Sequence, residues 1–165
     1  QKAEKSFWYS YISLFPNVHT NVLYFNEQEI QQLQGSNLQT ITTKLHAQVK
    51  QDYENLFTNF LFKKHAEVFD PNFYSLERYK WAVSVIWSRA VDVQIEGKLV
   101  RVMVPFVDFM NHQLNVNMSH KFDVQENAFV VKANQLCKKE NQIFLNYGAL
   151  PNVRLLHLMG FTIPE

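Results

Sequence analysis

The spacing of the apolar residues changes at about residue 90, and this change constrains the fold more than any other feature of the sequence. Before it, Ile41, Leu45 and Val49 recur at three- to four-residue steps, the spacing that lines side chains on one face of a helix. After it, residues 91–95 alternate as a strand does. The sequence therefore predicts helices followed by strands, an α+β arrangement of a helical layer beside small irregular sheets.

The helical half carries several boundary signals. Asn26 with Glu29 has the spacing of a capping box, and Gly35 is expected to end that short helix. A long helix is predicted over residues 38–63, followed by a break at residues 70–72. Ser75 is expected to cap a further, well-buried helix. Its apolar stripe consists of Tyr79, Ala82, Val83, Ile86, Trp87 and Ala90.

The second half predicts short strands separated by turns. Residues 99–106 form a strand interrupted by Pro105, and residues 121–125 and 128–132 form a hairpin. A short strand over residues 143–147 leads to Gly148. A final helix over residues 151–159 starts at Pro151 and closes at Gly160. Gly148 and Gly160 serve either as a turn and a helix C-cap, which we favour, or as points of close backbone approach.

Composition excludes several classes of protein. Cys137 is the only cysteine, so an internal disulfide framework and a zinc site made of several thiolates are both excluded. The formal net charge of +1 gives no strong field for nucleic acid, and we expect no direct binding to it. No apolar run approaches the roughly 20 residues that span a bilayer, so no membrane segment is expected. The remaining candidate zinc ligands, His112, His120 and His157, match no compact motif.

Polar residues follow the strand that ends at Pro105. Asp108, Asn111 and His112 punctuate an otherwise apolar stretch. They either form a turn whose side chains satisfy local backbone groups, or they form an elbow that recognises a ligand. An asparagine offers both a donor and an acceptor, which suits the edge of a purine ring.

Two further segments lie near the C-terminal end of the chain. Tyr147 stands between Asn146 and Gly148 at a predicted strand end, where its hydroxyl could approach a substrate; tyrosine is also a common strand residue. Phe161 follows Gly160 and could pack on an adenine ring or simply on the core. Each segment is weak alone, but the order and spacing of the three are more specific.

Taken together, these segments resemble the SET-domain methyltransferases, in the branch that contains Rubisco large-subunit lysine methyltransferase and actin-histidine methyltransferase. The match runs through Asp108, Asn111-His112, Asn146-Tyr147-Gly148 and Gly160-Phe161, and the aromatic segment 7–16 and the helix ending at Arg89 extend it over nearly the whole chain. The resemblance implies part of a SET-domain β fold with a helical insert and a pseudoknot near the C-terminus. The corresponding segments are 1–25, leading into the insert; 26–90, the insert; and 91–165, the C-terminal half of the SET domain.

The resemblance also implies S-adenosylmethionine as the cofactor and no metal. Asn111 and His112 would hold its adenine and amino-acid parts, while Arg89 and Asp108 would line the same pocket. Tyr147 would stand at the site of methyl transfer, and also count among the cofactor-binding residues. Phe161 would pack against the adenine.

The implied function is protein-lysine N-methylation of a protein substrate. The alternative is a catalytically inactive SET fold that acts as a scaffold or an assembly subunit of a larger complex. Three departures from the family support that alternative: the family's Gly-rich cofactor strand is either upstream or lost, and Asn146 and Met159 are unusual at their positions. The single cysteine and the absence of a targeting signal make a cytoplasmic or nuclear location the default expectation.

Overall fold

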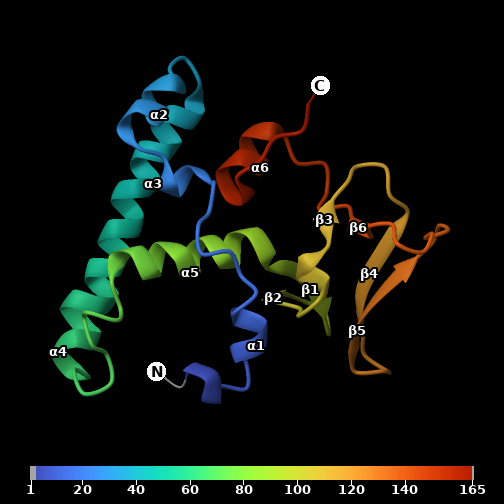
Figure 1. Ribbon diagram of the computed structural model, residues 1–165, viewed down its shortest axis with the longest axis horizontal. Coiled ribbons are helices and arrows are strands. Elements are labelled where there is room, and N and C mark those ends of the chain that lie inside the picture. The colour runs from blue at the N-terminus through green and yellow to red at the C-terminus, as the bar shows by residue number, and fades with distance from the viewer. Residues whose placement is uncertain (1–2, 165) are drawn as a thin grey trace. The chain divides into compact units, whose positions relative to one another are not determined.

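The computed structural model describes residues 3–164 and contains helices and short strands (Figure 1). The helices are α1 (Tyr9–Ile12), α2 (Glu27–Gln32), α3 (Asn37–Tyr53), α4 (Phe62–Lys64), α5 (Leu76–Arg89) and α6 (Asn152–Met159), with 3-10 turns η1 (Ala3–Lys5), η2 (Val22–Tyr24) and η4 (Val107–Phe109) and the π-helix η3 (Glu54–Leu61). The strands are β1 (Val91–Ile95), β2 (Lys98–Val102), β3 (Asn111–His112), β4 (Met118–Asp123), β5 (Ala128–Ala133) and β6 (Phe144–Leu145). This mixture confirms the predicted α+β class.

The chain divides into two compact units, each built from two stretches of sequence. Unit 1 comprises residues 1–11 and 89–150, and unit 2 comprises residues 12–88 and 151–165. The predicted segments 1–25, 26–90 and 91–165 stay a prediction, and their terminal residues 1, 2 and 165 lie outside the described part of the chain. Among the described residues, no helix combines the length and apolar character needed to cross a membrane.

The helix starts of unit 2 follow the sequence signals. Asn26 and Glu29 form the predicted capping box, with the Asn26 backbone N–H donating to the Glu29 carboxylate at 2.8 Å. Ser36 caps α3 by accepting from the Leu38 amide, and Ser75 accepts from the Arg78 amide before α5. The short helix α2 ends at Gln32, three residues before the predicted Gly35, which adopts φ +85° in the turn that follows.

The predicted long helix is confirmed, but it changes pitch. Helical backbone runs unbroken through α3, η3 and α4, from residue 37 to residue 64, and η3 is wound as a π-helix. In a π-helix, each amide bonds to the carbonyl five residues back, so residues five apart stand on one face. Phe57 and Phe62 use this spacing, with ring centroids 5.6 Å apart. A search for helical periodicity of 3.6 residues could not have found this turn.

The core of unit 2 lies where η2, α3, α5 and α6 meet. Its fully buried members are Val22, Leu23, Thr42, Ser84, Leu155 and Asn21. Asn21 caps η2 through the Leu23 amide, and its side-chain amide donates to the Leu158 carbonyl at 3.4 Å. A buried amide that is bonded on both sides holds η2 against α6.

The sequence predicted the wrong buried face for α5. Ser84 and Val85 are buried, whereas Ile86 of the expected stripe is 46% exposed. The buried face is centred on Ser84, which is fully buried and whose hydroxyl lies 3.5 Å from the Asn21 side-chain oxygen. The polar η2 cap therefore sets the orientation of this helix.

Gly160 fulfils both interpretations of its role. It closes α6 as a left-handed C-cap with φ +79°. A Cβ at this position would also lie 2.4 Å from the Thr20 hydroxyl and 2.6 Å from the Asn21 amide nitrogen. Pro151 forms the N-cap of α6, one residue before its predicted place in the first turn. The helix end and the close approach both require glycine.

The described part of unit 1 contains three two-stranded sheets. Strands β1 and β2 pair antiparallel, as do β4 and β5, which confirms the predicted hairpin with longer strands. Strand β2 ends at Val102, so the predicted extension through Pro105 was wrong. Strands β3 and β6 pair parallel, with Asn111 opposite Phe144 and His112 opposite Leu145. This last pairing joins the two polar segments singled out in the sequence.

Candidate functional site

A buried carboxylate organises the turn before β3. The backbone after Pro105 turns at Phe106, which has φ +71°, and continues as η4. The side chain of Asp108 in η4 is only 1% exposed. An Arg89 guanidinium nitrogen lies 3.3 Å from its Oδ2 and 3.0 Å from its backbone oxygen. The two residues predicted to line one pocket therefore form an ion pair with each other.

Tyr11 completes this pair and was missed as a site residue. Its hydroxyl donates to Asp108 Oδ2 at 2.7 Å, and its ring meets the Phe109 ring edge-on at 5.8 Å. Burial, followed by the hydrogen bond to Asp108, raises the pKa of Tyr11 above its ordinary value. The hydroxyl thus remains protonated and acts as a donor to the carboxylate at neutral pH.

His112 positions Tyr147 from the neighbouring strand. The Tyr147 amide donates to His112 Nδ1 at 3.1 Å, and the two rings stack with centroids 5.0 Å apart. Since Nδ1 accepts this hydrogen bond, the neutral imidazole carries its proton on Nε2. Strand β6 ends at Leu145, rather than at the predicted residue 147, because the Tyr147 amide bonds to a side chain instead of to a strand.

The Tyr147 hydroxyl lies at the start of β3. It donates to the backbone oxygen of Met110, the residue directly before β3. Burial raises the pKa of this phenol, with a smaller lowering effect from Arg89 and a further raising effect from Asp108. Tyr147 is therefore a neutral phenol whose two ends are fixed by the segment of residues 110–112.

Asn146 fixes the turn around Tyr147 and is a second residue that sequence reasoning missed. Its side-chain amide donates to the Leu114 carbonyl at 2.9 Å, and its side-chain oxygen accepts from the Gly148 amide at 2.8 Å. The residue was interpreted as a departure from the family pattern. In the structure it bridges the segment after β3 and the glycine turn after Tyr147.

The remaining predicted residues occupy different places. Asn111 lies in β3 with an exposed side chain, beside His112 and opposite Phe144. Five of the predicted residues, Arg89, Asp108, Asn111, His112 and Tyr147, belong to unit 1. Phe161 belongs to unit 2, so its role beside the others stays a prediction. Within residues 3–164, no group of three or more His, Cys, Asp or Glu side chains is arranged to hold a metal ion.

This arrangement has the chemical character of a binding elbow beside a positioned phenol. Asn111 presents an amide and an open strand segment, which can donate and accept hydrogen bonds in one plane. Asp108 Oδ1 is buried and forms no hydrogen bond to any described residue. A neutral Tyr147, held by one hydrogen bond from its hydroxyl and one from its backbone amide, can orient a small polar group without supplying charge. The site suits recognition and alignment more than general base catalysis.

Comparisons with known proteins identify the fold. The family model described as SET domain matches residues 11–148. N-lysine methyltransferase SETD6 from Homo sapiens is 27% identical over 172 residues, which cover 99% of this chain and 36% of that protein. The chloroplastic Rubisco large-subunit N-methyltransferase from Pisum sativum is 28% identical over 172 residues, covering 98% of this chain and 34% of that protein.

A solved structure agrees with these relatives. The structure of Rubisco LSMT bound to AdoMet superposes with a TM-score of 0.73 at 25% identity, covering 98% of this chain and 36% of that one. The chain thus spans about a third of the length of the relatives that it matches. The predicted SET fold is confirmed, and its motif residues lie within or beside the matched region. This chain belongs to the SET-domain family.

Proposed function

We propose that this chain forms part of the catalytic domain of an S-adenosylmethionine-dependent protein-lysine N-methyltransferase. One observation carries the proposal: the structure brings Asn111 and His112 next to Tyr147. The parallel pairing of β3 and β6 and the His112–Tyr147 hydrogen bond hold them together. A relative named as an N-lysine methyltransferase, another named as an N-methyltransferase, and a solved relative bound to AdoMet support the same assignment.

The residues present fit the cofactor. S-adenosylmethionine carries an adenine edge, ribose hydroxyls and an ammonium group, all of which need hydrogen-bond partners. Asn111 and the backbone of β3 supply donors and acceptors for the adenine and amino-acid parts, and the buried Asp108 Oδ1 supplies an acceptor that no described residue uses. Arg89 pairs with Asp108 and fixes the turn that leads into the elbow. When bound, the cofactor supplies an electrophilic methyl group.

Tyr147 contributes alignment to this chemistry. A lysine amine must arrive uncharged, although its free pKa is about 10.4. Apolar and aromatic surroundings disfavour the ammonium form and promote loss of its proton. The Tyr147 oxygen retains acceptor capacity while its proton is committed to Met110, so it can accept a hydrogen bond from the amine and fix its direction. In an in-line displacement, such alignment accounts for much of the rate enhancement.

The test uses the intact, full-length protein and two variants. S-adenosylhomocysteine is titrated calorimetrically into the wild type, Asn111→Ala and Tyr147→Phe. We expect wild-type binding, at least tenfold weaker binding by Asn111→Ala, and nearly unchanged binding by Tyr147→Phe. Transfer of a labelled methyl group to lysines in a proteome from cells lacking the protein should then be lost with Tyr147→Phe. Failure of the wild type to bind, or equal methyl transfer by Tyr147→Phe, overturns the proposal.

A second function is favoured by one observation. Phe7 is 88% exposed and Trp8 51% exposed, and their rings meet edge-on at 5.0 Å. Large exposed aromatics of this kind often anchor protein partners. A non-catalytic scaffold within a larger complex would use this pair for assembly. Co-purification of the intact protein in a complex, lost with Phe7→Ala and Trp8→Ala and accompanied by no S-adenosylhomocysteine binding, would favour this function.

A further inference from the structure

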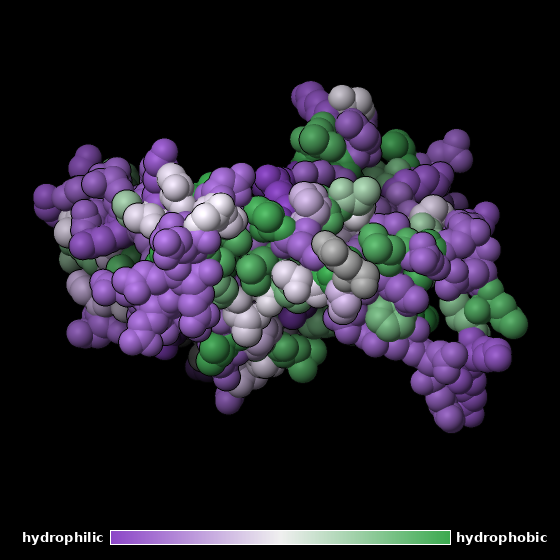
Figure 2. Space-filling model, turned by 90° about the horizontal axis from the view of Figure 1, so that it is seen from above, coloured by the Kyte–Doolittle hydropathy of each residue, from purple (hydrophilic) through white to green (hydrophobic). Residues whose placement is uncertain are grey.

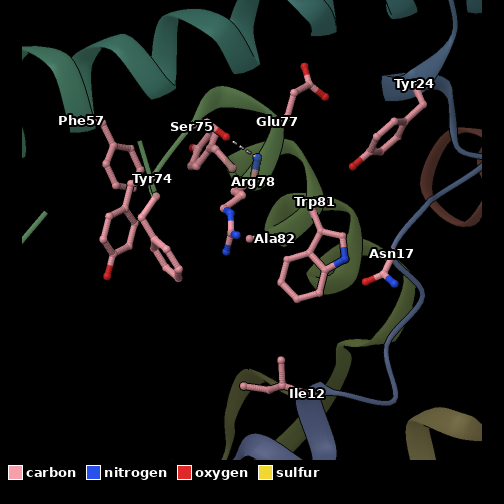
Figure 3. Close-up of a pocket in the computed structure, with 12 residues that line it drawn as sticks. Ile12, Asn17, Tyr24, Phe57, Tyr74, Ser75, Glu77, Arg78, Trp81 and Ala82 are labelled. Carbon is pink, nitrogen blue, oxygen red and sulfur yellow. Dashed lines mark hydrogen bonds between the residues drawn. The ribbon is translucent and has the colours of Figure 1, made fainter. Parts of the chain in front are cut away.

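Unit 2 contains a cavity that the candidate methyl-transfer site does not use. Its volume is about 700 Å³, within the range of about 300–1,000 Å³ that is typical of ligand sites. Figure 3 shows Phe57 and Tyr74 on one side, Trp81 and Tyr24 on the other, and Arg78 between them. The lining residues that complete the wall are Ile12, Asn17, Phe73, Ser75, Glu77, Tyr79 and Ala82.

The π-helix supplies one wall of the cavity. Phe57 lies within η3, and its ring stacks on Tyr74 at 5.8 Å and meets Tyr79 edge-on at 5.9 Å. The Tyr53 hydroxyl donates to the Tyr74 backbone oxygen at 2.8 Å and fixes the loop that carries Tyr74. π-Helical turns are rare and occur frequently at functional sites. Here the change of pitch places an aromatic side chain in the cavity wall.

The polar groups around the cavity are mostly engaged within the protein. Glu77 forms an ion pair with Lys80 at 3.3 Å. The Trp81 indole donates to the Pro16 carbonyl at 2.8 Å, and the Ser75 hydroxyl caps α5. These bonds hold the wall in place and leave little negative charge for a cationic ligand.

Arg78 is the exception. Its guanidinium carbon lies 4.1 Å from the centre of the Phe73 ring, a cation–π contact between two residues of the cavity lining. Within residues 3–164 its guanidinium has no ion pair and no hydrogen bond. The cavity thus combines an aromatic lining with one positive charge that is not neutralised within residues 3–164. A complementary ligand has a large apolar body and an adjacent anionic group.

We propose that this cavity docks a segment of the protein substrate in which a large apolar side chain stands next to an aspartate or glutamate. The identity of the occupant rests on the proposed function, since a methyltransferase that acts on proteins meets its ligand as a polypeptide. The apolar side chain enters between Trp81 and Phe57, and the carboxylate pairs with Arg78. A lysine or arginine at the acidic position is rejected by Arg78, which gives the pocket specificity as well as affinity.

The test measures binding of fluorescein-labelled nonapeptides to the full-length protein by fluorescence anisotropy, with no cofactor present. One peptide carries a central tryptophan flanked by aspartates, a second replaces the aspartates with lysines, and a third replaces the tryptophan with alanine. Protein variants are Arg78→Gln and, as a matched control, Lys44→Gln, which removes an exposed positive charge of unit 2 outside the cavity. S-adenosylhomocysteine titration of the same preparations reports separately on the methyltransferase proposal.

The expected results follow from the two parts of the pocket. The alanine peptide should bind at least tenfold more weakly than the acidic tryptophan peptide, because a buried aromatic anchor dominates such contacts. Arg78→Gln should weaken the acidic peptide about threefold to fivefold, as for an exposed ion pair, and Lys44→Gln should change nothing. No peptide binding, equal binding of acidic and basic peptides, or equal effects of the two variants overturns the docking proposal, whatever S-adenosylhomocysteine shows.

Discussion

Replacing Tyr11 by phenylalanine removes one hydroxyl and keeps the ring that contacts Phe109. The lost hydrogen bond, 2.7 Å long, ends on the Asp108 carboxylate. Hydrogen bonds to charged groups contribute about 1.5–3 kcal/mol, and because this one is only partly buried we expect a loss of about 1–2 kcal/mol. Arg89 continues to neutralise Asp108, so the turn before β3 should loosen without collapsing.

Hydrogen–deuterium exchange on the intact protein measures this loss where it arises. Peptides covering residues 104–112 should lose protection by about fivefold to thirtyfold in Tyr11→Phe, which corresponds to the same free energy. Tyr9→Phe serves as the control, because Tyr9 is 41% exposed and its hydroxyl bonds to no described residue. Protection in residues 104–112 that is equal in the two variants would refute the assignment of Tyr11 to the site.

The pH dependence gives a second check on Tyr11. Its pKa is raised in the folded state, so the folded protein keeps this proton at a pH where the unfolded chain, with a pKa of about 10, has released it. The associated stability is present below about pH 10 and is lost as the pH rises further. The urea midpoints of wild type and Tyr11→Phe should therefore converge above about pH 10. A constant difference would show that the hydroxyl is not buried against the carboxylate.

Three other substitutions test features of the fold and the site. Gly160→Ala should destabilise the intact protein by about 1–3 kcal/mol or more in urea unfolding, since it combines a positive φ with a backbone clash; Gly148→Ala, which has the positive φ and no clash, should cost less. Burial, and to a lesser extent Arg154, lowers the pKa of His157, so the folded protein resists protonation of this histidine. His157→Gln should therefore reduce the loss of stability on acidification below about pH 6.5. An unchanged dependence of stability on acid pH would contradict this. Asn146→Ala should lower the methyl-transfer rate at saturating substrate about tenfold while leaving the affinity for S-adenosylhomocysteine unchanged. Asn146→Asp keeps only the oxygen that accepts from the Gly148 amide, and it should recover part of the methyl-transfer rate. Parallel losses of rate and affinity would indicate a merely structural role.

Local signals predicted the fold well where a single turn of backbone decides the outcome. The capping box at Asn26 and the C-cap at Gly160 depend on neighbouring residues alone, and both were found as predicted. The π-helix and the register of α5 depend on contacts with distant side chains, so periodicity could not reveal them. The exposed face in Figure 2, where apolar and polar side chains are interspersed, shows why apolar spacing alone is a poor guide to burial here.

The same distinction applies to the candidate site. The order of Asp108, Asn111, His112 and Tyr147 pointed to one site before any contact was known, and unit 1 contains all four. Tyr11 was missed because it is 97 residues from Asp108, although the aromatic segment that contains it had been noticed. Asn146 was misinterpreted because its contribution consists of two hydrogen bonds that exist only in the folded turn.

The parallel pairing of β3 with β6 also sets the order in which the protein can acquire its site during synthesis. The β4–β5 hairpin lies between these strands and can form within microseconds of leaving the ribosome, which shortens the loop that remains to be closed. Until residues 144–147 emerge, Asn111 and His112 have neither a strand partner nor the tyrosine that they hold. A nascent chain therefore carries the binding elbow as an unpaired strand while residues 113–143 are being added. Nascent chains arrested before residue 144 should be good substrates for chaperones that capture exposed strands.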